Sequence, residues 1–221
     1  MTRSEQLFEQ FCACNGLVPH KVPEGKSRSP DYYLDVDENR LVVEVKQIDP
    51  NKQERSVLRK PPDEWNEGDI FHWDIPGDRL RNKIANAMPQ LRALSEGVYP
   101  TLLVVYDNVK AWPELTDEYA VRVAMHGIET AIITPETAPE GGAKIRERWY
   151  GLRKRVTARH NTTLSAIAVM SDQDCDILMT VYHNWYAKNP MGRQLLALPG
   201  VAHFELDHAP DAGFPEWKRR T

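Results

Sequence analysis

Three charged residues whose types could do chemistry lie near the start of the chain. Asp31 follows Pro30 in the segment SPDYYLDVDENRLVVEVKQ, and Glu44 and Lys46 stand two apart in the β-prone run LVVEVK. Alternate residues of a strand share a face, so Glu44 and Lys46 point to the same side. Two carboxylates suit Mg²⁺, which prefers oxygen ligands and keeps several of its waters. An ammonium group beside them can hold or activate such a water for attack on phosphorus.

The convergence of these residues depends on the register of a predicted β-hairpin. We expect strands at 31–36 and 41–48, joined by the four-residue loop DENR. With this loop, three cross-strand pairs follow: Val36 with Leu41, Tyr33 with Glu44, and Asp31 with Lys46. Directly opposed residues share a face, so the three charged residues meet on one surface, and a one-residue slip would scatter them. The alternative is an ordinary hairpin with a cross-strand Asp–Lys ion pair, which contributes little stability.

The remaining pattern predicts an α/β protein with a mixed central β-sheet flanked by helices. Helices are expected at 3–14, 79–94, 116–125 and 144–159. Further strands are expected at 101–107, 128–134, 164–170, 177–186 and 203–207, of which the first three read as buried. The polar stretch 49–77 is long for a loop in a compact domain, so it is either functional or partly disordered. We therefore expect one domain over residues 1–221 with a long insertion at about 49–77.

Composition narrows the classes of protein. The chain has 221 residues, of which 27% are charged and 41% hydrophobic, as in globular proteins. No run approaches about 18 apolar residues, so no membrane span is expected. The N-terminal segment lacks an apolar signal-peptide stretch, which predicts an intracellular, cytoplasmic protein. The three cysteines form neither a CxxC pair nor an even set, so disulfides and a cysteine zinc site are not expected.

The chain resembles the PD-(D/E)xK nuclease superfamily, which has the restriction-endonuclease-like fold. The resemblance is carried by Pro30-Asp31, by Glu44-Val45-Lys46 and by the following Gln47, in the order helix, hairpin, helix, strand. It implies that Asp31, Glu44 and the carbonyl group of Val45 bind a divalent metal, and that Lys46 positions the attacking water. A glutamate of the first helix often joins such a site. Glu9 is preferred over Glu5, because two phenylalanines flank it and would hold its backbone against the core.

The same resemblance implies a function. We expect a nuclease that hydrolyses phosphodiester bonds with Mg²⁺, for which Mn²⁺ can substitute, and DNA as its substrate because most of the family acts on DNA. A homodimer is an open option, and no membrane is expected as a partner. One alternative is a catalytically inactive nuclease fold that binds DNA or another protein. Another is an unrelated α/β protein with a fortuitous hairpin motif.

Any DNA-binding surface of this protein must be a local basic patch, because the net charge of the whole chain is −4. The segment KIRERWYGLRKRVTARH, residues 144–160, has apolar residues spaced 4, 3 and 4 apart, which predicts a helix with one narrow buried stripe. Four basic residues then share a flank of that stripe and are the predicted DNA contacts: Lys144, Arg148, Arg155 and Arg159. The alternative is a solvated basic helix face.

A group of acidic residues and histidines near the C-terminus has a less specific pattern. His203, Glu205, Asp207 and His208 could suggest a metal cluster, because alternation in a strand would place residues 203, 205 and 207 together. An exposed edge strand near the C-terminus is the preferred interpretation. We also interpret the segment YHNWY, residues 182–186, as a strand end rather than a catalytic His-Asn pair.

Overall fold

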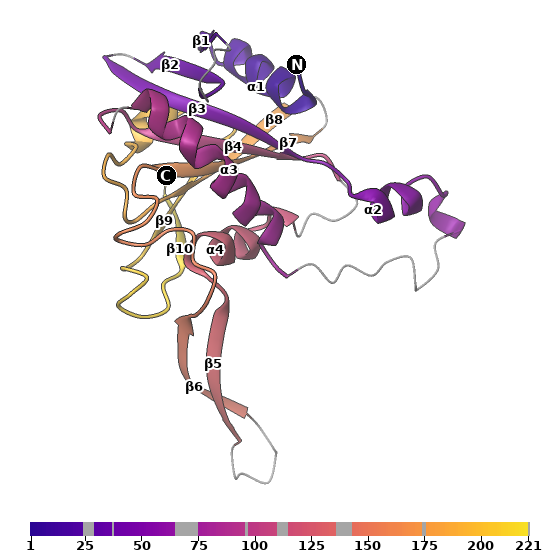
Figure 1. Cartoon of the computed structure of the whole chain (residues 1–221), viewed down its shortest axis with the longest axis vertical. Helices are drawn as coiled ribbons and strands as arrows, with labels where there is room; N and C mark the ends of the chain where they lie inside the picture. Colours follow the sequence, from indigo (N-terminus) through magenta and orange to yellow (C-terminus); the bar gives the residue numbers. More distant parts are fainter. Residues whose placement is uncertain are drawn as a thin grey trace.

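The computed structural model describes residues 1–23, 29–36, 38–64, 75–95, 97–109, 115–135, 143–173 and 176–220. Within them the protein has an eight-stranded mixed β-sheet with helices on both faces (Figure 1). In spatial order its strands are β1 (Pro19–Lys21), β2 (Tyr32–Val36), β3 (Asn39–Ile48), β4 (Thr101–Asp107), β7 (Ala166–Gln173), β8 (Asp176–His183), β9 (Val201–Leu206) and β10 (Trp217–Arg220). This confirms the predicted α/β class and the mixed central sheet.

The centre of the sheet is parallel. Strand β4 lies between β3 and β7 and runs parallel to both, whereas β2 joins β3 as an antiparallel hairpin. Parallel neighbours need crossover connections. Helix α3 (Asp78–Ser95) lies in the connection from β3 to β4, and α4 (Glu118–His126) in the connection from β4 to β7. The strands predicted at 101–107 and 164–170 are therefore the buried centre of the fold.

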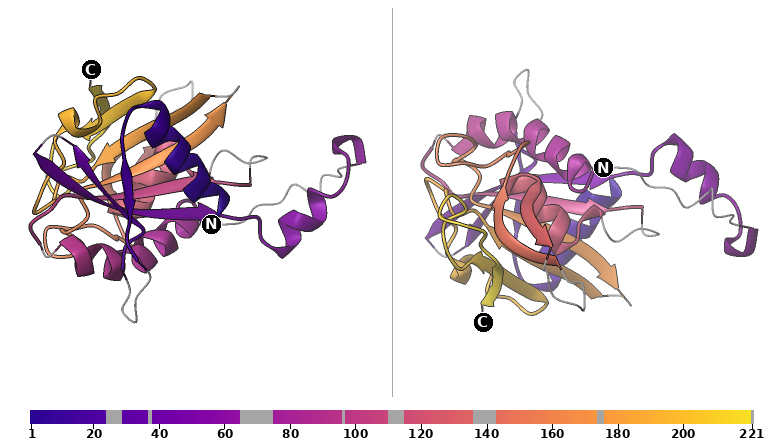
Figure 2. Two further views of the ribbon diagram at one scale, coloured as in Figure 1. Left: turned by 90° about the horizontal axis from the view of Figure 1, so that it is seen from above. Right: turned by 90° about the horizontal axis from the view of Figure 1, so that it is seen from below.

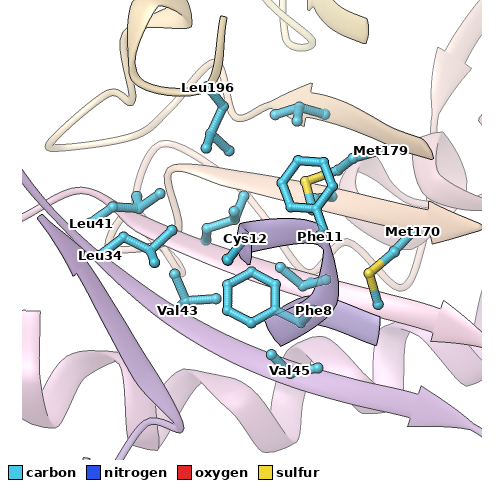
Figure 3. Close-up of a cluster of buried hydrophobic side chains, with 14 of the residues drawn as sticks. Phe8, Phe11, Cys12, Leu34, Leu41, Val43, Val45, Met170, Met179 and Leu196 are labelled. Atoms are coloured by element: carbon cyan, nitrogen blue, oxygen red, sulfur yellow. The ribbon is translucent and has the colours of Figure 1, made fainter. Parts of the chain in front are cut away.

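Helix α1 (Arg3–Cys14) covers one face of the sheet (Figure 3). Thr2 begins it with a capping box, in which the Thr2 side chain accepts from the backbone N–H of Glu5 and the Glu5 carboxylate accepts from that of Thr2. Phe8 and Phe11 are both 1% exposed and pack on Val43 and Val45 of β3 within one apolar cluster. The helical spacing of the phenylalanines thus attaches α1 to the strand that carries the candidate site.

Helices α3 and α4 cover the opposite face (Figure 1). The predicted stripe of α3 is buried there, with Leu80, Ile84 and Leu91 all 0% exposed. Val42 of β3 belongs to the same cluster, so residues of β3 with even numbers face α3 and those with odd numbers face α1. Glu44 and Lys46 consequently lie on the α3 side of the sheet.

Two parts of the chain project from this body. Strands β5 (Glu129–Pro135) and β6 (Ala143–Tyr150) form a separate two-stranded arm (Figure 1). Helix α2 (Lys52–Val57) and a short 3₁₀ turn (Pro62–Glu64) extend sideways after β3 (Figure 2). They belong to the predicted insertion at 49–77, of which residues 65–74 lie outside the described part.

The arm corrects two predictions. Residues 143–150 form a strand rather than a helix, and residues 151–160 contain neither a helix nor a named strand. The run KIRERWY contains a β-branched residue and two aromatic residues, which favour a strand once a partner is present. That partner, β5, was predicted as a buried strand. Because the arm leaves the body, Ile132 and Ile133 are instead 43% and 59% exposed.

The strand predicted at 203–207 was also predicted wrongly as an exposed edge. Strand β9 pairs with β8 on one side and β10 on the other, because the last strand of the chain covers it. His203 is buried and lies 2.9 Å from His183 between the two ring nitrogens. Glu205 instead faces arginines, at 3.5 Å from Arg193 and 3.4 Å from Arg220. The strand end predicted in YHNWY is confirmed, since β8 ends at His183.

Candidate active site

The β2–β3 hairpin sets the geometry of the site. Val36 pairs with Asn39 and Tyr32 with Val43, so only two residues join the strands instead of four. The predicted register was therefore wrong by two residues, because the shorter connection is the commoner hairpin loop. A shift of two retains the face of every side chain. Continued by one residue, this register places Asp31 opposite Glu44.

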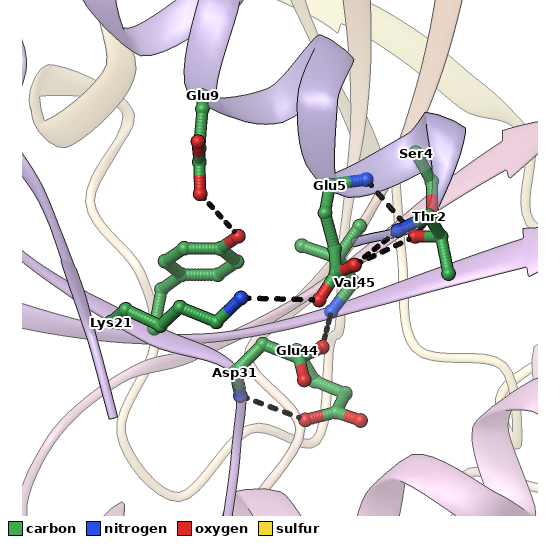
Figure 4. Close-up of polar contacts among 9 residues, drawn as sticks. Thr2, Ser4, Glu5, Glu9, Lys21, Asp31, Glu44 and Val45 are labelled. Atoms are coloured by element: carbon green, nitrogen blue, oxygen red, sulfur yellow. Dashed lines mark hydrogen bonds and ion pairs between the residues drawn. The ribbon is translucent and has the colours of Figure 1, made fainter. Parts of the chain in front are cut away.

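Asp31 and Glu44 are linked through backbone groups (Figure 4). The N–H of Asp31 donates to Oε2 of Glu44 at 3.1 Å, and the N–H of Val45 donates to Oδ2 of Asp31 at 2.8 Å. On the other side, the Lys46 ammonium group forms an ion pair with Oε1 of Glu44. The structure thus brings the three predicted residues together at the point where β2 begins.

The two carboxyl groups are shielded from solvent to different degrees: Glu44 is fully buried and Asp31 is partly buried. Glu44 is 0% exposed, and the Lys46 side chain is 23% exposed. Burial raises the pKa of Glu44 to about 7; the Lys46 ammonium opposes this rise and the charge of Asp31 adds to it. Burial also raises the pKa of Asp31 above its usual value, against the hydrogen bond from Val45 and the charge of Lys46. A cation bound between the carboxylates would favour their charged forms.

The oxygen atoms available match a hard divalent cation. Val45 lies two positions beyond Val43, the last β3 residue paired with β2, and a strand residue directs its N–H and C=O to the same side. The Val45 carbonyl therefore faces the edge where its N–H bonds to Asp31. Among the described residues, no three histidine, cysteine, aspartate or glutamate side chains group as a metal site. The donor set is accordingly two carboxylates and a backbone carbonyl, which suits Mg²⁺ with its remaining waters.

The two glutamates of α1 differ in their placement (Figure 4). Glu9 accepts a hydrogen bond from the Tyr32 hydroxyl group at 2.8 Å. Glu5 lies 3.8 Å from the Lys21 ammonium group, and its charge helps to raise the pKa of Asp31. The structure therefore brings Glu5 close to the carboxylate pair, whereas Glu9 is occupied by Tyr32.

Two further polar residues lie near the site: Gln47, which belongs to the motif quoted from the sequence, and Lys83, which no motif indicates. Gln47 accepts from the backbone N–H of Ser4 at 2.9 Å and donates to Asp49 at 2.5 Å, which ties the start of α1 to the end of β3. Lys83 of α3 is partly buried; desolvation lowers its pKa, opposed by the charge of Asp49, and the charge of Lys46 lowers it further. Only the packing of α3 on β3 brings Lys83 there.

The four predicted DNA contacts do not lie on one helix. Lys144 is exposed on β6, and Arg148 on the same strand forms an ion pair with Glu129. Arg155 is partly buried, and its Nε has no hydrogen-bond partner among the described residues. Arg159 lies in the loop that follows the arm. Because 143–150 is a strand, the helical flank that would have aligned these residues does not exist.

Comparisons of the chain with protein-family models, with curated proteins and with solved structures found no match in any of the three. Of the helices in the described ranges, none has the length and apolar character needed to cross a bilayer.

Proposed function

We propose that the protein is a divalent-metal-dependent nuclease with a restriction-endonuclease-like core that hydrolyses phosphodiester bonds in DNA. The observation that carries this proposal is the meeting of Asp31, Glu44 and Lys46 at one strand edge. An ion pair alone would require only one of the carboxylates. The second, Asp31, brings another negative charge next to a fully buried glutamate, which is unfavourable without a cation. The parallel pair β3–β4 behind this edge supports the assignment of the core.

Each residue has a distinct role in this proposal. Asp31, Glu44 and the Val45 carbonyl would hold Mg²⁺, which supplies Lewis-acid activation of the phosphate and lowers the pKa of bound water. Lys46 orients the attacking water and offsets negative charge that develops on the phosphorus centre. Its ammonium group already lies against Glu44, on the face of the sheet where the carboxylates meet.

The surface after β3 is the best supported contact for DNA. Helix α2 follows β3 directly and projects from the body (Figure 2). Its acidic residue, Glu54, is buried and paired with Arg79, which leaves the exposed side of α2 basic. Lys52 and Arg55 are exposed on α2 and Arg59 just after it. Basic side chains on an ordered helix are suited to phosphate contacts.

A cleavage assay tests the catalytic assignment. Purified protein is incubated with single-stranded, duplex and branched DNA, with Mg²⁺ or with a chelator. We expect cleavage that requires Mg²⁺ and is abolished by Lys46→Ala, assayed under conditions in which circular dichroism shows that the variant is folded. Lys144→Ala removes a lysine from the arm and is expected to cleave normally. Cleavage at the wild-type rate by Lys46→Ala would disprove the role of that residue, and DNA binding without any cleavage would favour an inactive binding module.

A binding assay tests the DNA surface independently of cleavage. Lys52→Glu with Arg55→Glu should weaken DNA binding with little dependence on sequence. Neutral replacements at the same two positions should lower the salt slope by roughly 0.9 for each lost phosphate contact. The matched control is Lys144→Glu with Arg148→Glu, since it changes the charge equally on the arm. Equal losses in both double variants would show that α2 is not a preferred contact.

A further inference from the structure

The two strands of the arm differ in how their outer edges are protected. Strand β6 has four charged residues, and its register with β5 skips Arg146, so the bulge lies in β6. Charges and bulges both hinder a further strand from pairing with an edge. Residues 130–134 of β5, TAIIT, have neither, and Pro135 stands only at the last position of the strand. The charge of Glu129 is neutralised by its ion pair with Arg148 of β6. The edge of β5 is therefore open to strand addition.

Large apolar side chains of the arm are exposed. They are Ile132 and Ile133 of β5 and Ile145 and Trp149 of β6. In the part of the chain that the structure describes, β5 pairs with β6 alone, and the two strands project from the body (Figure 1). A two-stranded ribbon is at best marginally stable in water. A partner strand that extends this sheet would stabilise it by covering part of its apolar surface.

The base of the arm is fixed to the body. Tyr150, at the end of β6, is buried, and its hydroxyl group donates to the carbonyl of Pro215 at 3.2 Å. The guanidinium group of Arg148 lies 4.2 Å from the centroid of the Phe214 ring. Because these contacts already hold the arm in place, a partner can pair with β5 at a reduced cost in conformational entropy.

The partner that suits this edge best is β5 of a second copy of the chain. When two identical strands pair antiparallel about a two-fold axis, residues near the axis stand close to their own copies. Like charges would repel there, and residues 130–134 contain none. Their threonine and isoleucine side chains are well suited to cross-strand pairs. Nucleic acid is a poor alternative, because this segment offers no cation to a phosphate.

We propose that the protein forms a homodimer in which the β5 strands of two copies pair antiparallel and join the two arms into one four-stranded sheet. Ile132 is the middle residue of the uncharged segment, so its two copies lie near the axis. One short strand buries less than the roughly 800 Å² per partner of a standard interface, so the dimer should dissociate at micromolar concentrations. This proposal does not rest on nuclease activity.

Sedimentation equilibrium of the full chain, from micromolar to submillimolar concentrations, tests the dimer. We expect the wild-type protein to pass from monomer to dimer over this range. Ile132→Lys and Ile132→Glu each bring like charges together near the axis, so each variant should remain a monomer with the circular dichroism of the wild type. The control is Leu152→Lys, which replaces an exposed apolar residue just after the arm and should dimerise as the wild type does.

An equimolar mixture of the Ile132→Lys and Ile132→Glu proteins tests whether β5 pairs with its own copy. Opposite charges then meet near the axis, so the mixture should dimerise although neither protein does so alone. If the substitutions merely disrupted the arm, the mixture would stay monomeric, and that result would overturn the pairing of β5. The proposal is also overturned if the wild type is monomeric at every concentration, or if both Ile132 variants dimerise as strongly as the wild type.

Discussion

The buried carboxyl group of Glu44 makes a sharp prediction about stability. Its pKa rises from 4.5 to about 7 on folding, mainly because burial disfavours the charge. The folded protein therefore binds this proton more tightly than the unfolded chain. The contribution of Glu44 to stability is then fully present below about pH 4.5, decreases as the pH rises towards 7, and is lost above that. At about 1.4 kcal/mol per pH unit, the loss is about 3 kcal/mol.

Glu44→Gln removes the titration and retains the shape of the side chain. In the presence of a chelator, the free energy of unfolding of the wild type should fall by about 3 kcal/mol relative to the variant between about pH 5 and pH 8. Urea unfolding at several pH values measures this difference. Glu147→Gln on the exposed arm is the control, and its profile should parallel that of the wild type.

Mg²⁺ should act on the same free energy. A cation held by Asp31 and Glu44 favours both charged forms, so saturating Mg²⁺ should stabilise the wild type at neutral pH and flatten its pH profile. Glu44→Gln should show little of this effect. Parallel pH profiles for wild type and Glu44→Gln would refute the unfavourable burial of this charge. Equal stabilisation of both proteins by Mg²⁺ would refute the metal site.

Two further predictions concern α1 and a glycine. Glu5→Gln should weaken the stabilisation by Mg²⁺ in a thermal melt and Glu9→Gln should not, because only the charge of Glu5 acts on Asp31; equal effects would contradict this placement. Gly127 has φ 103°, and an added Cβ would lie 2.7 Å from a backbone oxygen, whereas Gly16 has φ 69° with open space around it. Gly127→Ala should therefore cost about 3 kcal/mol and Gly16→Ala about 1 kcal/mol in urea unfolding, and equal costs would exclude crowding at Gly127.

The sequence predicted best where local pattern and burial agree. The helical stripe of α1, the apolar strand β4 and the stripe of α3 all appear close to their predicted bounds. The prediction for segment 144–160 was wrong because the spacing of its apolar residues fits a helix, while its β-branched and aromatic residues also suit a strand. Only a partner distant in the chain, β5, decides between them. Short elements such as α2 and β10 had too few residues for a periodic signal.

The candidate site was likewise predictable only in part. That Glu44 and Lys46 share a face follows from their spacing alone, and Asp31 joins that face in either register because the error was an even number of residues. Which side chains of the site contact each other could not be predicted from the sequence. The hydrogen bond from Val45 to Asp31, the preference for Glu5 and the approach of Lys83 depend on how α1 and α3 pack on β3.

The sequence by itself thus determined the chemical types at the candidate site, their common face and the α/β class of the protein. Periodicity is a property of the local chain, so it survives without knowledge of the partners. Only the tertiary structure decided that Glu44 is fully buried and that the charge of Glu5 acts on Asp31 while Glu9 binds Tyr32. Burial and hydrogen bonding depend on segments distant in the chain, whose approach is decided by packing of the whole core.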